Sequence, residues 1–129
     1  MASEIFTVDG FDGFRTVKTI EIVTAAVRKY ADEVRLAFSV VKVYLFGSWA
    51  KGTASNRSDV DVCFFLESFN GRSKINVLTD ISKLTWNYYW VGIEPHAFEA
   101  ANLSCGHPFV REILRTGTEI WPGRGSKVA

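Results

Sequence analysis

This chain has little of what marks secreted or membrane-bound proteins. Among its 129 residues it has only two cysteines, Cys63 and Cys105, and their spacing fits neither a disulfide framework nor a metal-binding motif. The first residues contain no basic segment leading into an apolar stretch, so no secretory signal is expected. No apolar run approaches the roughly 20 residues needed to cross a bilayer. We therefore expect a protein of a reducing compartment, the cytoplasm.

The chain also lacks an excess of charge of either sign. It has 15 Lys and Arg against 14 Asp and Glu, a net charge of +1, which argues against an overall basic footprint for nucleic acid but leaves a local patch open. Hydrophobic residues make up 47% of the chain and include ten Phe, which is enough to fill a core. The length fits one domain, which we place at residues 1–121, followed by a flexible tail at 122–129.

Hydrophobic periodicity predicts alternating helices and strands. Apolar residues that recur every three or four positions indicate amphipathic helices, and β-branched or aromatic runs bounded by turn residues indicate strands. The predicted helices are 16–38, 73–89 and 108–115, and the predicted strands are 40–47, 59–67, 90–94 and 118–121. The predicted fold class is α/β (α+β), a single domain with a mixed β-sheet flanked by helices.

Two carboxylates stand at the start of a strand that is otherwise apolar. Because side chains alternate along a strand, Asp59 and Asp61 project from the same face. Both can ionise comfortably only with a cation between them, and clustered carboxylate oxygens suit Mg²⁺. Upstream, Gly47 and Ser48 end another strand, where backbone N–H groups and a hydroxyl can hold an anion. A phosphate cradle beside a metal site outlines a nucleoside-triphosphate site.

The stretch "GSWAKGTASNRSDVDV" is similar to the nucleotidyltransferase signature of the DNA polymerase β-like superfamily: Gly-Ser, ten residues, then Asp-x-Asp. Within this superfamily the chain resembles the minimal nucleotidyltransferase (MNT) group, also through "IEPHAFE" and "HPFVREILRTGTEIW". The fold of that group is a mixed sheet with helices packed on it. The resemblance implies transfer of AMP from Mg-ATP to an acceptor hydroxyl.

The resemblance also implies roles for single residues. Gly47 and Ser48 would hold the β- and γ-phosphates of ATP, and Asp59 and Asp61 would ligate two Mg²⁺ ions. The third carboxylate of the family would be Glu94, although aspartate is more usual at that position. The implied catalytic and metal-binding residues are therefore Asp59, Asp61 and Glu94.

The choice of Glu94 has support in its surroundings. Pro95 favours an extended backbone at the residue before it, and Gly92, on the same face of the predicted strand, leaves room around the carboxylate. The alternatives that remain open are Asp80, Glu67 and Glu99.

Other polar residues near the signature have more than one reading. Lys51 and Ser58 are candidates for contacts with the nucleotide, but Lys51 and Arg57 are more commonly solvated loop charges. His96 and His107 lack metal-ligand spacing, and we expect each to make an ordinary polar contact.

Aromatic residues raise a further alternative. The stretch "LTWNYYWVG" (84–92) holds two Trp and two Tyr within five residues, and a helix cannot bury all four on one side. A crowded core and an exposed interface both stay open. Trp49 could likewise stack on a base, contact a partner or pack a short helix.

The resembled group suggests a partner. Its members are typically paired with a helical HEPN-type protein in a toxin–antitoxin system, in which the MNT domain is the antitoxin and adenylylates a tyrosine of the toxin. Two alternatives remain: a non-catalytic module that masks a partner, and a small-molecule transferase of the aminoglycoside type, whose acceptor site would lie between the copies of a homo-oligomer.

Overall fold

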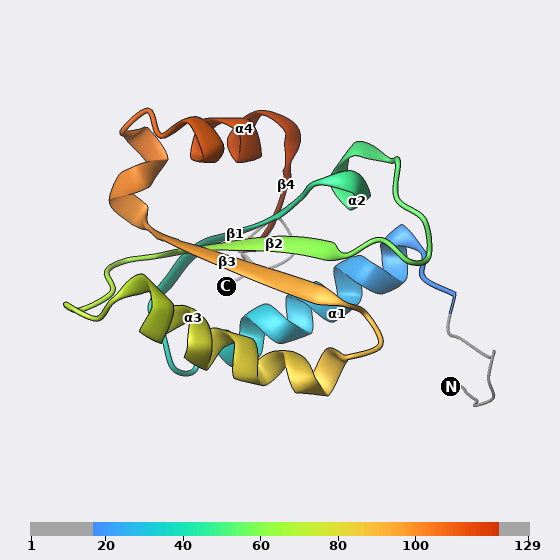
Figure 1. The fold of residues 1–129 in the computed structure, drawn as a ribbon, viewed down its shortest axis with the longest axis horizontal. Helices are drawn as coiled ribbons and strands as arrows, with labels where there is room; N and C mark the ends of the chain where they lie inside the picture. Colours follow the sequence, from blue (N-terminus) through green and yellow to red (C-terminus); the bar gives the residue numbers. More distant parts are fainter. Residues whose placement is uncertain (1–16, 122–129) are drawn as a thin grey trace.

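A computed structural model describes residues 17–121 of the chain, so the expected tail at 122–129 and residues 1–16 of the expected domain lie outside the described part. Helices and strands alternate along it (Figure 1). The helices are α1 (Ile20–Val34), α2 (Ser48–Lys51), α3 (Lys74–Lys83) and α4 (Pro108–Thr116), with the 3₁₀ helices η1 (Leu84–Tyr88) and η2 (Ala100–Ser104); the strands are β1 (Val40–Phe46), β2 (Val60–Leu66), β3 (Ile93–Glu99) and β4 (Thr118–Trp121).

The four strands form one mixed sheet in the order β3-β2-β1-β4. β1 is antiparallel to both β2 and β4, whereas β2 and β3 are parallel. Parallel neighbours need a crossover connection, which α3 and η1 provide. Helices cover both faces of the sheet (Figure 1), so the predicted fold class is confirmed.

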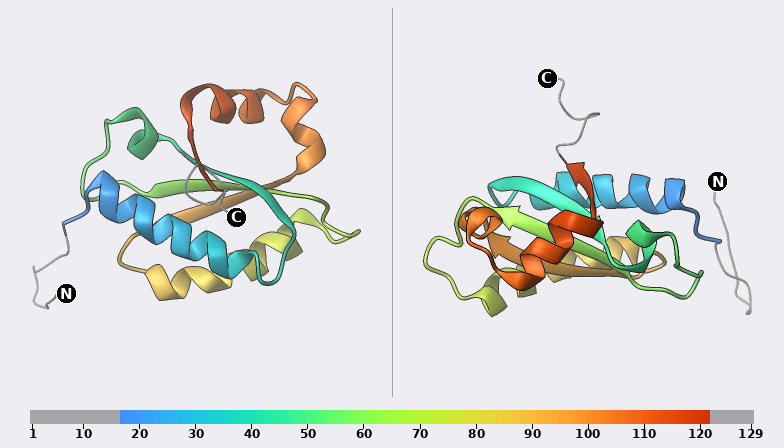
Figure 2. Two further views of the ribbon diagram at one scale, coloured as in Figure 1. Left: turned by 180° about the vertical axis from the view of Figure 1, so that it is seen from behind. Right: turned by 90° about the horizontal axis from the view of Figure 1, so that it is seen from above.

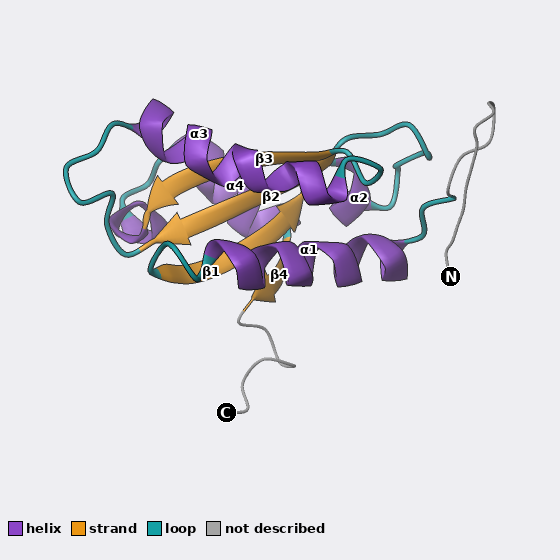
Figure 3. Cartoon of the chain, turned by 90° about the horizontal axis from the view of Figure 1, so that it is seen from below, coloured by secondary structure: helices purple, strands orange, loops and turns teal. Residues whose placement is uncertain are grey.

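α1, α3 and η1 cover one face of the sheet (Figure 3). The residues of β2 that point to this side are Val60, Val62, Phe64 and Leu66, and all four are fully buried in the main core. Tyr30 of α1 is also fully buried, and its hydroxyl donates a hydrogen bond of 2.8 Å to the carbonyl of Ile81 in α3. This bond satisfies a polar atom inside the core and joins the two helices.

α4 covers the opposite face of the sheet, as the view from above shows (Figure 2). A second buried cluster lies beneath it and includes Cys63 and Phe65 of β2. β2 is therefore buried on both faces, and Asp61 is its only residue that is not fully buried. A carboxylate in such a strand requires a compensating partner.

The third strand differs from its prediction. We expected a strand at 90–94, but β3 begins at Ile93 and continues past Pro95 to Glu99. Pro95 is tolerated because β3 lies at the edge of the sheet, where a missing N–H breaks no ladder on the open side. Gly92 has a φ of +77° and lies in the turn before β3, not on a strand face beside Glu94.

Two predicted helices are also shorter than expected. The helix expected at 16–38 is α1, which begins after Thr19, whose hydroxyl accepts from the N–H of Ile22. The helix expected at 73–89 changes to 3₁₀ geometry after Lys83. Within residues 17–121, none of the helices has the length and apolar character needed to span a membrane.

Candidate active site

Strand pairing brings Asp61 and Glu94 together. Asp61 of β2 is the direct neighbour of Glu94 on β3 and of Phe46 on β1. His96 lies two residues beyond Glu94, so it projects from the same face of β3. Side chains from two strands that are distant in the sequence therefore meet on the face of the sheet that α4 partly covers.

Asp61, Glu94 and His96 form a compact group of ligand atoms. One such atom from each of the three lies within 4.8 Å of the others. Nε2 of His96 is 3.7 Å from Oδ1 of Asp61, which is too long for a hydrogen bond. This nitrogen is buried and has no hydrogen-bond partner among residues 17–121. Asp59 is exposed, immediately before β2, and is not part of this group.

The surroundings of Asp61 disfavour the negatively charged form of its carboxyl group. Burial and the negative charge of Glu94 raise the pKa of the Asp61 carboxyl, Asp59 adds to this effect, and His96 opposes it. A cation between the carboxylates would relieve both the repulsion and the loss of solvation. The site therefore favours binding of a positive ion.

Gly47 lies against the Asp61 carboxylate. A β-carbon at position 47 would collide with Oδ2 of Asp61. Gly47 also has φ +74° and ψ −153°, a region of backbone conformation that is essentially restricted to glycine. The first residue of the signature is thus in contact with its last carboxylate.

Ser48 begins α2, which is a single helical turn at the end of β1 (Figure 1). The carbonyl of Gly47 accepts hydrogen bonds from the N–H groups of Ala50 and Lys51 at 3.1 and 3.0 Å. The first N–H groups of a helix have no partner within it, so this turn can offer donors even though so short a helix has only a small dipole. Lys51 is exposed at the end of the turn.

Ser58 closes the loop between α2 and β2. Its hydroxyl accepts a hydrogen bond of 2.8 Å from the N–H of Ser55. Its carbonyl accepts from the indole N–H of Trp49 at 3.3 Å, and Trp49 packs against the main core. Among the readings of Trp49, packing is therefore the one that these contacts support, and Lys51 and Ser58 as nucleotide contacts stay predictions.

Lys18 joins this loop to the start of β3. Its ammonium donates to the carbonyl of Ser58 at 3.1 Å and to that of Val91 at 2.8 Å, and its own N–H donates to Oδ1 of Asn56 at 2.6 Å. Burial lowers the pKa of Lys18, and the nearby Asp59 opposes that shift. This role could not be predicted from the sequence, because the partners of the ammonium are backbone carbonyls.

The three alternatives to Glu94 have other contacts or lie elsewhere. Asp80 on α3 forms an ion pair of 2.8 Å with Arg72. Glu99 accepts a hydrogen bond of 2.8 Å from the N–H of Phe69, and Glu67 is exposed beyond the end of β2. Of these carboxylates, Glu94 is the one that strand pairing sets beside Asp61, and its role as the third carboxylate stays a prediction.

The two histidines differ. His107 makes an ordinary polar contact, as expected: its Nδ1 accepts from the N–H of Phe109 at the start of α4, at 3.2 Å. His96 was wrongly expected to be similar, but it belongs to the carboxylate group. The alternation of side chains in a strand was the available signal, because Glu-x-His places both residues on one face.

The aromatic stretch 84–92 divides between core and surface. Tyr88 is buried, and its hydroxyl donates to Oε2 of Glu33 at 2.6 Å. Trp86 and Tyr89 are each 78% exposed, and Trp90 is 39% exposed. We call these three residues the aromatic surface; their exposure does not agree with a crowded core, and an interface at this surface stays a prediction.

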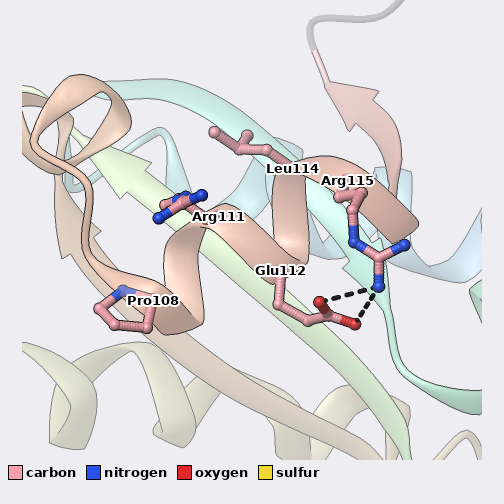
Figure 4. Close-up of a pocket in the computed structure, with 5 residues that line it drawn as sticks. All are labelled: Pro108, Arg111, Glu112, Leu114 and Arg115. Carbon is pink, nitrogen blue, oxygen red and sulfur yellow. Dashed lines mark hydrogen bonds and ion pairs between the residues drawn. The ribbon is translucent and has the colours of Figure 1, made fainter.

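A shallow hollow on α4 lies apart from this chemistry. Its lining includes Arg111 and Arg115 but neither Glu94 nor Asp61 (Figure 4). Arg115 is paired with both carboxylate oxygens of Glu112, each at 3.0 Å. The hollow therefore lacks the group of ligand atoms that defines the candidate active site.

Comparison with known proteins gives the fold and the family of the chain. A candidate nucleotidyltransferase from Sulfolobus solfataricus has a similar fold, with a TM-score of 0.59 and 17% identity, covering 84% of this chain and 92% of that chain; at this identity the likeness concerns the fold alone. No curated protein matches the sequence significantly. The sequence profile of the nucleotidyltransferase domain matches residues 27–116. The chain therefore belongs to the nucleotidyltransferase domain family.

Proposed function

We propose that this nucleotidyltransferase domain transfers AMP from Mg-ATP to a hydroxyl group, that of a tyrosine on a partner protein. The observation that carries the proposal is the contact of Gly47 with the Asp61 carboxylate, next to Glu94 on the neighbouring strand. In this proposal the anion-binding end of the signature lies beside two carboxylates, as transfer from a metal-bound triphosphate requires.

The residues present fit a divalent cation. Asp61 and Glu94 offer the oxygen ligands that Mg²⁺ prefers, and a bound cation would offset the burial and the neighbouring negative charge that raise the pKa of Asp61. Asp61 and Glu94, joined by Asp59, would hold the two ions expected. Bound metal lowers the pKa of an acceptor hydroxyl and neutralises charge on the triphosphate.

The residues of the chain would then act mainly by positioning the reactants. Gly47 and Ser48 bind the β- and γ-phosphates, which leaves the α-phosphorus facing the carboxylates. The acceptor oxygen forms a bond to the α-phosphorus, and the bond from this phosphorus to the bridging oxygen of the β-phosphate breaks, so pyrophosphate leaves. Glu94 accepts the proton of the hydroxyl.

The acceptor belongs, in this proposal, to another chain. A domain of this size leaves little chain for a deep acceptor pocket, and the aromatic surface offers contact area of the kind that is enriched at protein interfaces. A helical HEPN-type toxin, adenylylated and neutralised by this domain as its antitoxin, fits these properties.

The direct test is transfer of label from ATP. With Mg²⁺ and the protein encoded beside it, we expect the purified domain to label a tyrosine of that partner. Asp61→Asn and Asp59→Asn should each abolish labelling, while Asp80→Asn, whose carboxylate pairs with Arg72 on the surface, should not. Labelling that survives Asp61→Asn, or none with the wild type, would contradict the proposal.

The exposed aromatic surface favours a second candidate function, a module that masks a partner without catalysis. In that case Asp61→Asn would leave binding and neutralisation of the partner intact, and Trp86→Ala with Tyr89→Ala would abolish both. If catalysis is the function, the Asp61 variant binds the partner but does not neutralise it.

A further inference from the structure

The side chain of His96 ends in a nitrogen atom that nothing in the described structure satisfies. Nε2 is buried without a hydrogen-bond partner, although buried polar atoms are normally paired with protein, water or an ion. The nearest charged atom is Oδ1 of Asp61, at 3.7 Å. An explanation of this atom must therefore involve the carboxylate group.

The ring of His96 is held in place by its neighbours. It packs on Phe46, with 5.1 Å between ring centroids, and on Phe109, at 5.8 Å. Phe109 lies at the start of α4 and Phe46 at the end of β1. Packing from two different elements directs Nε2 toward Asp61 at little entropic cost, which is how a ligand is pre-organised.

The distances suit a shared ion. Ligand atoms bind a small divalent ion at about 2.0–2.2 Å, so two ligands of one ion lie no more than about 4.4 Å apart. The 3.7 Å between Nε2 of His96 and Oδ1 of Asp61 is within this limit. It is too long for a direct hydrogen bond, so the pair is spaced for an atom between them.

We propose that His96 supplies a nitrogen ligand to the divalent ion held by Asp61 and Glu94, so that this site prefers Mn²⁺ to Mg²⁺. The inference rests on the proposed metal-dependent transfer. Its physical reason is the donor set: Mg²⁺ favours oxygen ligands alone, whereas imidazole nitrogen favours first-row transition ions. A site with two carboxylates and one imidazole should therefore prefer a first-row transition ion such as Mn²⁺.

The test measures metal binding in the absence of nucleotide. Free Mn²⁺ is followed by electron paramagnetic resonance during titration of the full chain, with Mg²⁺ as competitor, and electron spin-echo spectroscopy reports nitrogen bound to Mn²⁺. We expect the wild type to bind Mn²⁺ more tightly than Mg²⁺ and to show nitrogen coupling. His96→Phe keeps a ring against Phe46 and Phe109 and should weaken Mn²⁺ binding by at least about tenfold and remove the coupling.

Two further variants sharpen the test. His96→Gln offers an amide oxygen in place of the nitrogen, so it should remove the coupling and shift the preference back toward Mg²⁺. His107→Asn is the matched control: it changes the other histidine while retaining a residue suited to cap α4, and it should alter neither signal. Thermal unfolding of each variant confirms that it is folded.

The outcomes separate the two proposals. If Asp61→Asn abolishes Mn²⁺ binding but His96→Phe binds as the wild type does, the role of His96 is refuted while the metal site stands. The role of His96 is also refuted if the folded His96→Phe variant still shows nitrogen coupling to Mn²⁺. If the wild type binds neither metal without nucleotide, the role of His96 is refuted, while the proposed function, in which the phosphates of ATP help to hold the ions, is decided by the labelling test.

Discussion

Gly47 lies so close to the carboxylate of Asp61 that any side chain at position 47 would have to displace it. This contact joins the two ends of the signature, and we expect Gly47→Ala to damage both stability and metal binding. The strained φ alone destabilises the fold by about 1–3 kcal/mol, and the new methyl group must also displace Asp61. Urea unfolding and Mn²⁺ titration measure the two effects.

Gly52→Ala is the control for this substitution. Gly52 also has a positive φ, +79°, but nothing lies within 4 Å of an added β-carbon. It should lose only about 1–2 kcal/mol of stability through its left-handed backbone and should bind Mn²⁺ as the wild type does. Equal loss of metal binding in both variants would show that the contact with Asp61 is unimportant.

Removing the charge of Asp61 should stabilise the metal-free protein. Its raised pKa means that the folded protein holds more protons than the unfolded chain at pH values above the ordinary carboxyl pKa of about 4. The free energy of unfolding therefore falls as pH rises through this window. Asp61→Asn should remove that fall, as measured by urea unfolding in a chelator between pH 4 and 8.

Asp80 should affect the free energy of unfolding in the opposite direction to Asp61. Its hydrogen bond and ion pair with Arg72 lower the pKa of Asp80, so this carboxylate stabilises the fold at neutral pH, and that contribution is lost as pH falls toward the lowered pKa. Asp80→Asn should thus be less stable than the wild type at pH 7. If both Asn variants change stability in the same direction, the electrostatic account of Asp61 is wrong.

Lys18 should be needed to order the loop between α2 and β2. Lys18→Met removes the donor to the carbonyls of Ser58 and Val91, and a hydrogen bond from a charged group is worth about 1.5–3 kcal/mol. We expect loss of stability together with faster amide hydrogen exchange in residues 52–59. Lys29→Met, on an exposed part of α1, should change stability by less than about 0.5 kcal/mol.

Two neighbouring aromatic residues should respond differently to the same kind of change. Tyr88→Phe removes the hydrogen bond to Glu33, so the free energy of unfolding should fall by about 1.5–3 kcal/mol. Trp86→Phe alters a side chain that is 78% exposed and should leave stability unchanged. Thermal unfolding of the pair tests this; a stable Tyr88 variant would contradict the role given to its hydroxyl.

Much of the fold was predictable because local patterns and core packing agree. The strands β1, β2 and β4 lie within about one residue of their predicted bounds, since each combines β-branched or aromatic residues with clear turn signals. β3 was misplaced: the strand expected at 90–94 is found at Ile93–Glu99 and runs through Pro95. Only the strand order shows that β3 is an edge strand, where proline is tolerated.

The sequence by itself determined the signature: Gly47, Ser48, Asp59 and Asp61 have a spacing that can be read along one chain. Tertiary structure alone decided what surrounds it. The register of β2 against β3 sets Asp61 beside Glu94 and His96. The role of Lys18 depends on backbone carbonyls, which every residue has, so no residue type in the sequence indicates it. Contacts between distant segments depend on how strands pair and helices pack, which no local pattern contains.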